Sequence, residues 1–431
     1  MAVTISRRRA LSHSGIFLRC MAASRRGLRC ACIFAAAALS ISAVACGPLK
    51  GLAQHGHLVP GSLTIHRSTT VPFTLSGNRI YIKAVVGRTP YAFIFDTGGT
   101  AILVPEVQRD LKFPVISSVH VVGLGASEQD ANLVRVPMAR VGTARYGGGP
   151  FVVISVPGGV SPLPGLRFGG VLGREFFMSL VTVIDYEKST LTFYEPGSFR
   201  PDATAVALPL VVTDGHARVL CSIDGHSGNF DIDTGSAQGL TVTKMFAESA
   251  GLMEDFSRTS DAVIGHGVGG VVTGTVGRAK TFACGPLLMS GPVVGVAHSD
   301  SGVFAQPDVA GNIGGAIWRR FKVALDVPNS KFYLIPNARF ADAFTFNRAG
   351  LFSERNGEIE KVILVAPASP AAQAGVLAGD TISNIDGIAV THLSHDNVTA
   401  TWLRPVGTRI ILGLRRDGKP VSVSLALRDL L

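Results

Sequence analysis

Two copies of one tripeptide are the residues of this chain best suited to do chemistry. Asp96-Thr97-Gly98 and Asp233-Thr234-Gly235 each follow a short hydrophobic segment. One such tripeptide is expected from turns alone, because Asp and Gly are common turn residues. Its recurrence in the same setting favours a paired site over two unrelated turns.

A pair of carboxyl groups can activate water. Two carboxyl groups held close together cannot both ionise easily, so one keeps its proton while the other is charged. The charged group can take a proton from water, and the protonated group can support a carbonyl oxygen. We therefore predict Asp96 and Asp233 as catalytic, titrating as a unit without a fixed role for either. No cofactor or metal is expected, and no Cys/His cluster has metal-site spacing.

The neighbours of the aspartates fit tight loops around two carboxylates. Gly98 and Gly235 permit a backbone turn with amides directed at the carboxylates. Thr97 and Thr234 could cross-link the two loops through their hydroxyl groups. Both threonines also fit ordinary strand positions, since β-branched residues are common there.

A longer pattern repeats around each tripeptide. In both copies a hydrophobic segment, a Gly turn and a second hydrophobic segment lead into Asp-Thr-Gly. Farther along, a hydrophobic residue precedes Gly once per copy, at Leu172-Gly173 and at Ile313-Gly314. Two more segments rich in Val, Ile and Phe follow each, as expected for strands. The repetition predicts two all-β lobes, residues 71–200 and 201–340.

The arrangement resembles the aspartic proteases, more specifically the retropepsin-like branch found in tandem in bacterial proteins. The resemblance covers about residues 75–337 and rests on the two tripeptides and the two hydrophobic-Gly elements. It implies a pair of β-barrel lobes that share one active site, and aspartic-type endopeptidase activity on protein or peptide substrates. Ser236 fits the family pattern, whereas Gly99 stands where the family usually has Ser or Ala.

The family also implies flaps, which are β-hairpins that close over a substrate. Two Gly-rich segments follow the aspartates at a suitable distance, one with Gly123 and Gly125 and one with Gly265 and Gly267. The second also matches a phosphate-loop pattern, but a strand-like segment follows it instead of the required helix. A mobile surface hairpin without substrate contact is the alternative.

The last part of the chain, residues 345–431, has a different pattern. Ser369-Pro370-Ala371-Ala372, Gly379-Asp380 and Asp386-Gly387 resemble the motifs of a bacterial PDZ domain. This resemblance implies a small α+β domain that adds a peptide strand to a sheet edge and binds its terminal carboxylate. The carboxylate loop would be Gly350-Leu351-Phe352. A module that only packs on the rest of the chain is the alternative.

The N-terminus is typical of an export signal. Residues 1–46 hold seven arginines and no acidic residue, and an uncharged stretch there ends in small residues. That stretch is short for a membrane span. We expect a signal over 1–46, a linker over 47–70, and export to the bacterial periplasm or cell envelope. A membrane anchor would arise only if Cys46 is lipidated.

Composition and charge limit the partners and the fold class. Removing the seven signal arginines from the net charge of +10 leaves +3, so nothing indicates a nucleic-acid partner. With 47% hydrophobic and 16% charged residues the chain can bury a sizeable core. We predict a mainly β, bilobal fold followed by a PDZ-like domain, and a monomer, because two lobes complete the site.

Two alternatives stay open on the sequence. Cys221 and Cys284 are the cysteines beyond residue 46, and export permits a disulfide, but two buried free thiols fit equally well. The other class of function is a non-catalytic exported peptide-binding or scaffold protein on a degenerate protease fold. Inhibition by pepstatin-type compounds and substitution of the aspartates would separate that class from the enzyme.

Overall fold

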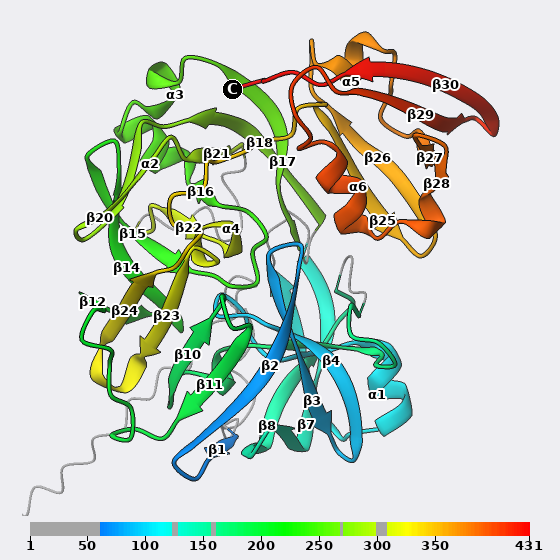
Figure 1. Cartoon of the computed structure of the whole chain (residues 1–431). Coiled ribbons are helices and arrows are strands. Elements are labelled where there is room, and N and C mark those ends of the chain that lie inside the picture. The colour runs from blue at the N-terminus through cyan, green and yellow to red at the C-terminus, as the bar shows by residue number, and fades with distance from the viewer. Residues whose placement is uncertain (1–60, 123–127, 157–160, 268–269, 299–307) are drawn as a thin grey trace, which may run out of the picture. The chain divides into compact units, whose positions relative to one another are not determined.

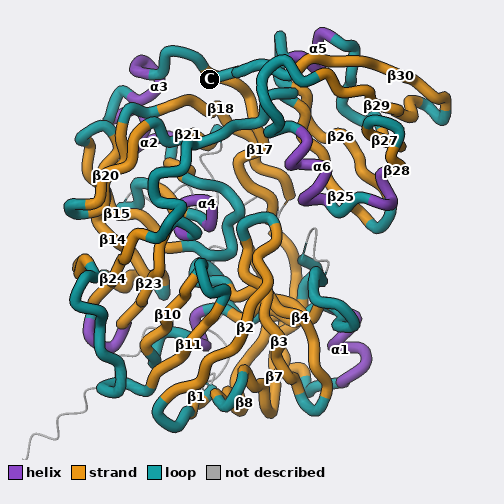
Figure 2. The backbone as a smooth tube through the Cα atoms, viewed as in Figure 1, coloured by secondary structure: helices purple, strands orange, loops and turns teal. Residues whose placement is uncertain are grey.

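The structure, a computed structural model, describes residues 61–122, 128–156, 161–267, 270–298 and 308–431. The predicted export signal, Cys46, Gly123 and Gly125 lie outside the described residues. Strands dominate the described part and form sheets of 14, 10 and 6 strands (Figures 1 and 2). The predicted mainly β fold class is confirmed. No helix in these ranges has both the length and the apolar character needed to span a membrane.

The first repeat (residues 71–200) and the segment before it form a run of short strands. Its elements are β1 (Ser62–Thr64), β2 (Ser68–Ser76), β3 (Arg79–Val86), β4 (Thr89–Phe95), β5 (Ile102–Leu103), α1 (Pro105–Leu111), β6 (Val115–Val122), β7 (Glu128–Val141), β8 (Ala144–Val153), β9 (Phe168–Leu172), η2 (Arg174–Phe176), β10 (Val181–Asp185) and β11 (Thr190–Tyr194). β1 pairs with β8, and β2 pairs with β11. The last part of the expected linker therefore belongs to the sheet.

The second repeat (residues 201–340) continues in the same way. Its elements are β12 (Val206–Pro209), β13 (Val211–Thr213), β14 (His216–Ile223), β15 (His226–Ile232), β16 (Leu240–Val242), α2 (Lys244–Ser249), α3 (Leu252–Asp255), β17 (Thr259–Gly267), β18 (Gly270–Arg278), β19 (Thr281–Cys284), β20 (Leu287–Ser290), β21 (Val293–Ala297), β22 (Gly311–Ile313), α4 (Gly315–Trp318), β23 (Phe321–Asp326), η4 (Val327–Asn329) and β24 (Lys331–Pro336). Its helices are short, as the scarcity of helical patterns predicts.

The strand pairing matches between the repeats where it positions the tripeptides. β3 pairs with β4 antiparallel and β4 with β9 parallel. In the second repeat β14 pairs with β15 antiparallel and β15 with β22 parallel. Each tripeptide thus leaves a strand held between a hairpin partner and a parallel strand. That parallel strand ends at the hydrophobic residue of the hydrophobic-Gly element.

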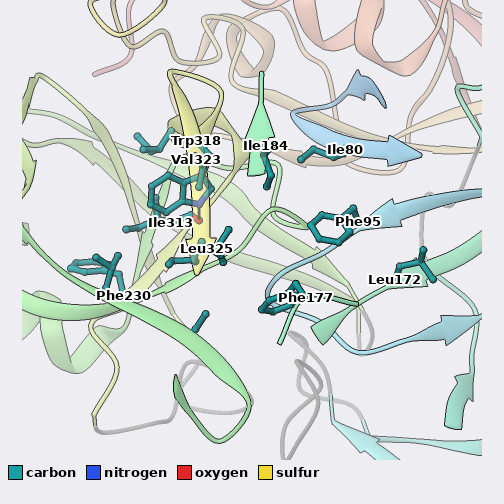
Figure 3. Close-up of a cluster of buried hydrophobic side chains, with 14 of the residues drawn as sticks. Ile80, Phe95, Leu172, Phe177, Ile184, Phe230, Ile313, Trp318, Val323 and Leu325 are labelled. Atoms are coloured by element: carbon teal, nitrogen blue, oxygen red, sulfur yellow. Dashed lines mark hydrogen bonds between the residues drawn. The ribbon is translucent and has the colours of Figure 1, made fainter. Parts of the chain in front are cut away.

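One seam joins the two repeats. β10 pairs antiparallel with β23, from Val181 opposite Asp326 to Asp185 opposite Lys322. A single large hydrophobic cluster contains side chains of both repeats. Figure 3 shows labelled members of this cluster, among them Ile184 of β10. Burial of this apolar surface is the main force that holds the repeats together.

The cysteines of β14 and β19 are joined. Ser222 lies opposite Ala283 in this strand pair, so the next residues, Cys221 and Cys284, face each other. Their Cα atoms are 4.4 Å apart, and a disulfide links them. Of the two alternatives left open by the sequence, the structure contains the disulfide and not two free thiols.

Cys221→Ser should lower the free energy of unfolding by about 2–4 kcal/mol, because the bond closes a long loop in the unfolded chain. Urea denaturation under oxidising conditions measures the loss. Cys284→Ser and the double variant serve as controls and should lose the same amount. Additive losses in the double variant would show that the bond does not form in solution.

The C-terminal unit has a sheet and a core of its own. Its elements are β25 (Leu351–Asn356), β26 (Ile359–Val365), α5 (Pro370–Gln373), β27 (Thr381–Ile385), β28 (Ile388–Ala389), η5 (Val390–His392), α6 (His395–Thr401), β29 (Arg409–Arg416) and β30 (Lys419–Ala426). The strand order is β25-β26-β27-β29-β30, with β28 beside β27, and Trp402 lies in the core. Asp417 and Gly418 join β29 to β30, and both have positive φ, 50° and 76°, as a two-residue hairpin turn requires.

Candidate active site

Each predicted aspartate begins a tight loop at the end of a strand. The Gly98 N–H donates to Asp96 Oδ1 at 2.8 Å, and the Gly235 N–H donates to Asp233 Oδ1 at 2.8 Å. A Cβ atom on Gly98 would lie 2.6 Å from Asp233 Cγ, and one on Gly235 would collide with the Asp96 carboxyl. Glycine is required in each loop because the carboxyl of the other repeat occupies the space above it.

The two carboxyl groups share a hydrogen bond. Burial, followed by the negative charge of Asp233 and the hydrogen bond to it, raises the pKa of Asp96 well above its ordinary value. The Gly98 N–H and the charge of Arg79 act in the opposite direction on this pKa but are weaker. Asp96 therefore keeps its proton at a pH where an ordinary carboxyl has lost it.

The threonines tie the two loops together. The Thr97 hydroxyl donates to the Ile232 carbonyl at 2.6 Å and accepts from the Thr234 N–H at 3.0 Å. The Thr234 hydroxyl donates to the Phe95 carbonyl at 2.8 Å and accepts from the Thr97 N–H at 3.1 Å. Both threonines are only 1% exposed. Four buried hydrogen bonds thus fix one loop against the other.

Thr97→Val should leave a buried N–H and a buried carbonyl unpaired while keeping the side-chain shape. Each unpaired group costs about 1–3 kcal/mol, so a clear drop in the free energy of unfolding is expected in urea denaturation. Thr97→Ser keeps the hydroxyl and is the matched control. A loss in Thr97→Val no larger than the loss in Thr97→Ser would contradict the role assigned to the hydroxyl.

The hydrophobic-Gly elements pack directly against the loops. A Cβ atom on Gly173 would collide with the backbone of Gly99, and one on Gly314 would lie 2.9 Å from the Ser236 carbonyl oxygen. Glycine is therefore needed at both positions because a backbone approaches closely. These contacts hold each aspartate loop close to the Gly residue that follows the parallel strand of the same repeat.

Two residues that sequence reasoning missed also reach the site. The Asn312 side-chain amide donates to Asp233 Oδ2, and the Arg79 guanidinium donates through Nε to the Gly235 carbonyl at 2.7 Å. A comparison of the repeats could have marked Asn312, because the matching residue of the first repeat is Val171. Nothing in the sequence distinguishes Arg79 from other residues that begin strands.

The flap candidates of the second repeat lie in the hairpin of β17 and β18. Gly265 is opposite Val272 and Gly267 is opposite Gly270. Gln238, in the loop after Asp233, donates through Nε2 to a carbonyl of β17 at 3.4 Å. The hairpin therefore contacts the loop that carries one of the carboxyl groups, and its role as a flap stays a prediction.

The three residues of the predicted carboxylate loop of the C-terminal unit lie in different environments. Gly350 has φ +66°, a left-handed conformation that glycine adopts freely. Leu351 is fully buried in the core, and Phe352 packs against Phe346 with ring centroids 6.3 Å apart. β25 begins within this segment, at Leu351, and is the end strand of its sheet in the described residues. The backbone of β25, more than the Leu351 side chain, is thus placed to contact a peptide.

The comparisons with known proteins identify this unit. Residues 350–427 match the family model described as PDZ domain. This part of the chain is a PDZ domain. The periplasmic serine endoprotease DegP of Escherichia coli (strain K12) is 41% identical over 65 residues, which are 15% of this chain and 14% of DegP. The carboxy-terminal-processing protease of Bartonella bacilliformis is 34% identical over 88 residues, 20% of either chain. The chain spans at most a fifth of these relatives.

A similarity to a solved structure extends beyond the PDZ domain. The crystal structure of aspartic proteinase from Irpex lacteus superimposes with a TM-score of 0.42 and 15% sequence identity. The superposition covers 64% of this chain and 99% of that chain.

The predicted enzyme class, an aspartic-type endopeptidase, is wrong against these relatives. They are named a serine endoprotease and a carboxy-terminal-processing protease. The error has a physical reason: two tripeptides define a pair of carboxyl groups, but a fold and a pair of acids do not by themselves determine the reaction or the group that catalyses it. The coarser statement holds, namely a protein with a PDZ domain that is similar over a short stretch to proteases.

Proposed function

We propose that this chain is an exported PDZ protein in which Asp96 and Asp233 activate a water molecule for attack on an acyl carbonyl of a peptide-derived substrate. The supporting observation is the hydrogen-bonded carboxyl pair in which the pKa of Asp96 is raised. Because the loops are cross-linked by Thr97 and Thr234, the pair is held in place before any substrate binds.

The chemistry needs one charged and one protonated carboxyl. The charged group takes a proton from water while the water oxygen bonds to the carbonyl carbon. The protonated group gives its proton to the carbonyl oxygen as the carbon–oxygen double bond becomes single. The tetrahedral product then collapses: the carboxyl that took the proton from water gives it to the leaving group, and the other carboxyl regains a proton from a hydroxyl group as the carbonyl re-forms. The pair carries one negative charge before and after the reaction.

The PDZ domain is proposed to bind the C-terminal segment of a peptide or protein. In the described residues, its edge strand β25 has one side without a strand partner, and a peptide strand would add there. The Gly350 N–H already donates to Asn347 Oδ1, so a bound carboxylate would have to displace that contact or use neighbouring amides. The periplasm is the proposed location, supported by the similarity to the periplasmic endoprotease DegP. The same proposal includes three domain boundaries, at 71–200, 201–340 and 345–431. It also includes a monomeric state and a relationship of the two lobes to the retropepsin-like fold.

Labelled water tests the proposal directly. The full chain is incubated in water enriched in oxygen-18 with mixed peptides and peptide esters, from acidic to neutral pH. Mass spectrometry should find the heavy isotope in new carboxyl groups, and the double variant Asp96→Asn/Asp233→Asn should not produce it. Peptide binding without isotope incorporation at any pH would favour the non-catalytic peptide-binding protein instead.

A further inference from the structure

The two repeats differ beside the carboxyl pair. In each repeat, three neighbouring strands place one residue apiece in a cross-strand row. The row of the first repeat consists of Tyr81, Ile94 and Val171. The row of the second repeat consists of Arg218, Asp231 and Asn312. Because the strand pairing is the same, an apolar row in one repeat has become a polar row in the other.

The apolar row is part of a buried hydrophobic cluster, whereas the polar row is a chain of contacts. Arg218 donates through Nε to Asp231 Oδ1 at 2.7 Å, and Arg218 is only 3% exposed. Next to Asp231, the amide of Asn312 donates to Asp233 Oδ2. The polar row therefore ends on the carboxyl pair.

Asp233 receives more hydrogen bonds than Asp96. In the part of the chain that the structure describes, N–H groups of Gly235, Ser236 and Asn312 all donate to Asp233. Asp96 accepts from one backbone N–H, that of Gly98. A carboxyl that accepts several N–H bonds is favoured in its charged form. The geometry alone thus makes the pair unequal.

The oxygen of the Asn312 side-chain amide, in contrast to its nitrogen, makes no hydrogen bond to the carboxyl pair in the described residues. This oxygen, Oδ1, is buried and has no hydrogen-bond partner among the described residues. Buried polar atoms are normally paired, because an unpaired one destabilises the fold. An asparagine selected for stability alone would be paired at both ends. In the described part of the chain, the side chain of Asn312 makes one hydrogen bond, the one to Asp233.

We propose that Asn312 is a positioning residue that keeps the negative charge of the pair on Asp233 and the proton on Asp96. The inference rests on the proposed function and assigns its two roles. Asp233 takes the proton from water, the water oxygen bonds to the carbonyl carbon, and Asp96 protonates the carbonyl oxygen. Val171 cannot do the same for Asp96, because its side chain has no donor.

The charged group that opposes this arrangement is Arg79. Its guanidinium lowers the pKa of Asp96 and so favours a charge there. In the described residues, Arg79 donates a hydrogen bond to the Gly235 carbonyl and none to either carboxyl of the pair. For the negative charge to stay on Asp233, the hydrogen bond from Asn312 to Asp233 must stabilise it more than the positive charge of Arg79 stabilises a negative charge on Asp96.

Three more titratable groups lie around the pair, namely His216, Tyr186 and Asp231. Burial lowers the pKa of His216, so this ring is neutral near neutral pH. Burial, and then the charge of Asp233, raise the pKa of Tyr186, which stays protonated. Burial raises the pKa of Asp231, while His216 and its partner Arg218 act against that rise. None of these groups donates a hydrogen bond to either carboxyl in the described residues.

Carboxyl titration tests the inference without a substrate. Protein labelled with carbon-13 at the aspartate carboxyls is titrated by NMR, with Asp96→Asn and Asp233→Asn used to assign the two signals. Asn312→Leu keeps the size but removes the donor. It should raise the lower apparent pKa of the pair by about one pH unit, a tenfold change in the charged fraction. Asn312→Ser keeps a donor and should restore part of the shift.

Two further variants guard against a folding defect. Asn312→Val reproduces the first repeat and should shift the titration in the same direction as Asn312→Leu. Val171→Asn combined with Asn312→Val should move the charge to Asp96, which reverses the order of the two signals. If folded Asn312→Leu and Asn312→Val both titrate like the native protein, the inference is overturned.

The outcomes separate this inference from the proposed function. A shifted titration in a protein that hydrolyses nothing would refute the proposed function and keep the role of Asn312 in the carboxyl pair. Hydrolysis whose pH profile is unchanged by Asn312→Leu would support the proposed function and refute the role of Asn312.

Discussion

Asp96→Asn and Asp233→Asn should each lower the rate of hydrolysis by about a thousandfold or more, because each removes one half of the acid–base pair. Asparagine keeps the shape of aspartate, so the Gly98 and Gly235 loops should remain closed. Oxygen-18 incorporation at the pH of highest native activity measures the loss. Glu254→Gln replaces an exposed carboxyl of the second repeat and should leave the rate unchanged.

Asp96→Asn should also change how the stability of the protein depends on pH. The folded-state pKa of Asp96 lies above its unfolded value. Its contribution to stability is therefore complete below the unfolded pKa and is lost as the pH rises through the folded pKa. Asp96→Asn cannot ionise, so its melting temperature relative to the native protein should increase between acidic and neutral pH. A constant difference between the two proteins over that range would contradict the raised pKa.

Arg355→Met should destabilise the PDZ domain by about 3–5 kcal/mol, because it leaves a buried carboxylate without its cation. Glu360 is 0% exposed. Its carboxylate accepts from Arg355 Nε at 2.6 Å, from the Ser353 hydroxyl at 2.6 Å and from His395 Nδ1 at 2.9 Å. Two of these partners lie on β25, so the edge strand should loosen. Peptide binding and urea denaturation measure the two consequences.

A matched control and a pH test accompany this variant. Arg415 is exposed on β29, and Arg415→Met should change stability by no more than about 0.5 kcal/mol. Burial acts to raise the pKa of Glu360, but hydrogen bonds from His395, Ser353 and Arg355 outweigh it and lower the pKa. This stabilisation is present above the ordinary pKa of glutamate and is lost as the pH falls through the lowered value. Glu360→Gln should remove that acid sensitivity, and an unchanged acid transition would refute the assignment.

Local pattern was enough to predict the elements that carry the two carboxyl groups. A hydrophobic strand followed by Asp-Thr-Gly is readable within one segment, and its recurrence indicated that Asp96 and Asp233 belong together. The glycines at 98 and 235 were predicted to permit a tight turn, but neither has a positive φ; glycine is required there because the carboxyl of the other repeat lies against each loop. The PDZ domain was predictable for the same reason, since its motifs are short and close in sequence.

Contacts between distant strands could not be predicted from the sequence. Asn312 reaches Asp233 only because β22 runs parallel to β15 in one register. The bond between Cys221 and Cys284 likewise depends on the register of β14 and β19. The enzyme class could not be predicted either, because a pair of acidic residues on a β fold does not by itself determine the reaction or the group that catalyses it.

The seam between β10 and β23 makes the carboxyl pair a property of the finished polypeptide. During synthesis, the loop of Asp96 is made long before β22 and β23 emerge, and until then Asp96 has no partner. A chain truncated after the first repeat would contain Asp96 but lack Asp233, and therefore could not form the carboxyl pair. Such a fragment should be inactive in the proposed hydrolysis until the second repeat is supplied.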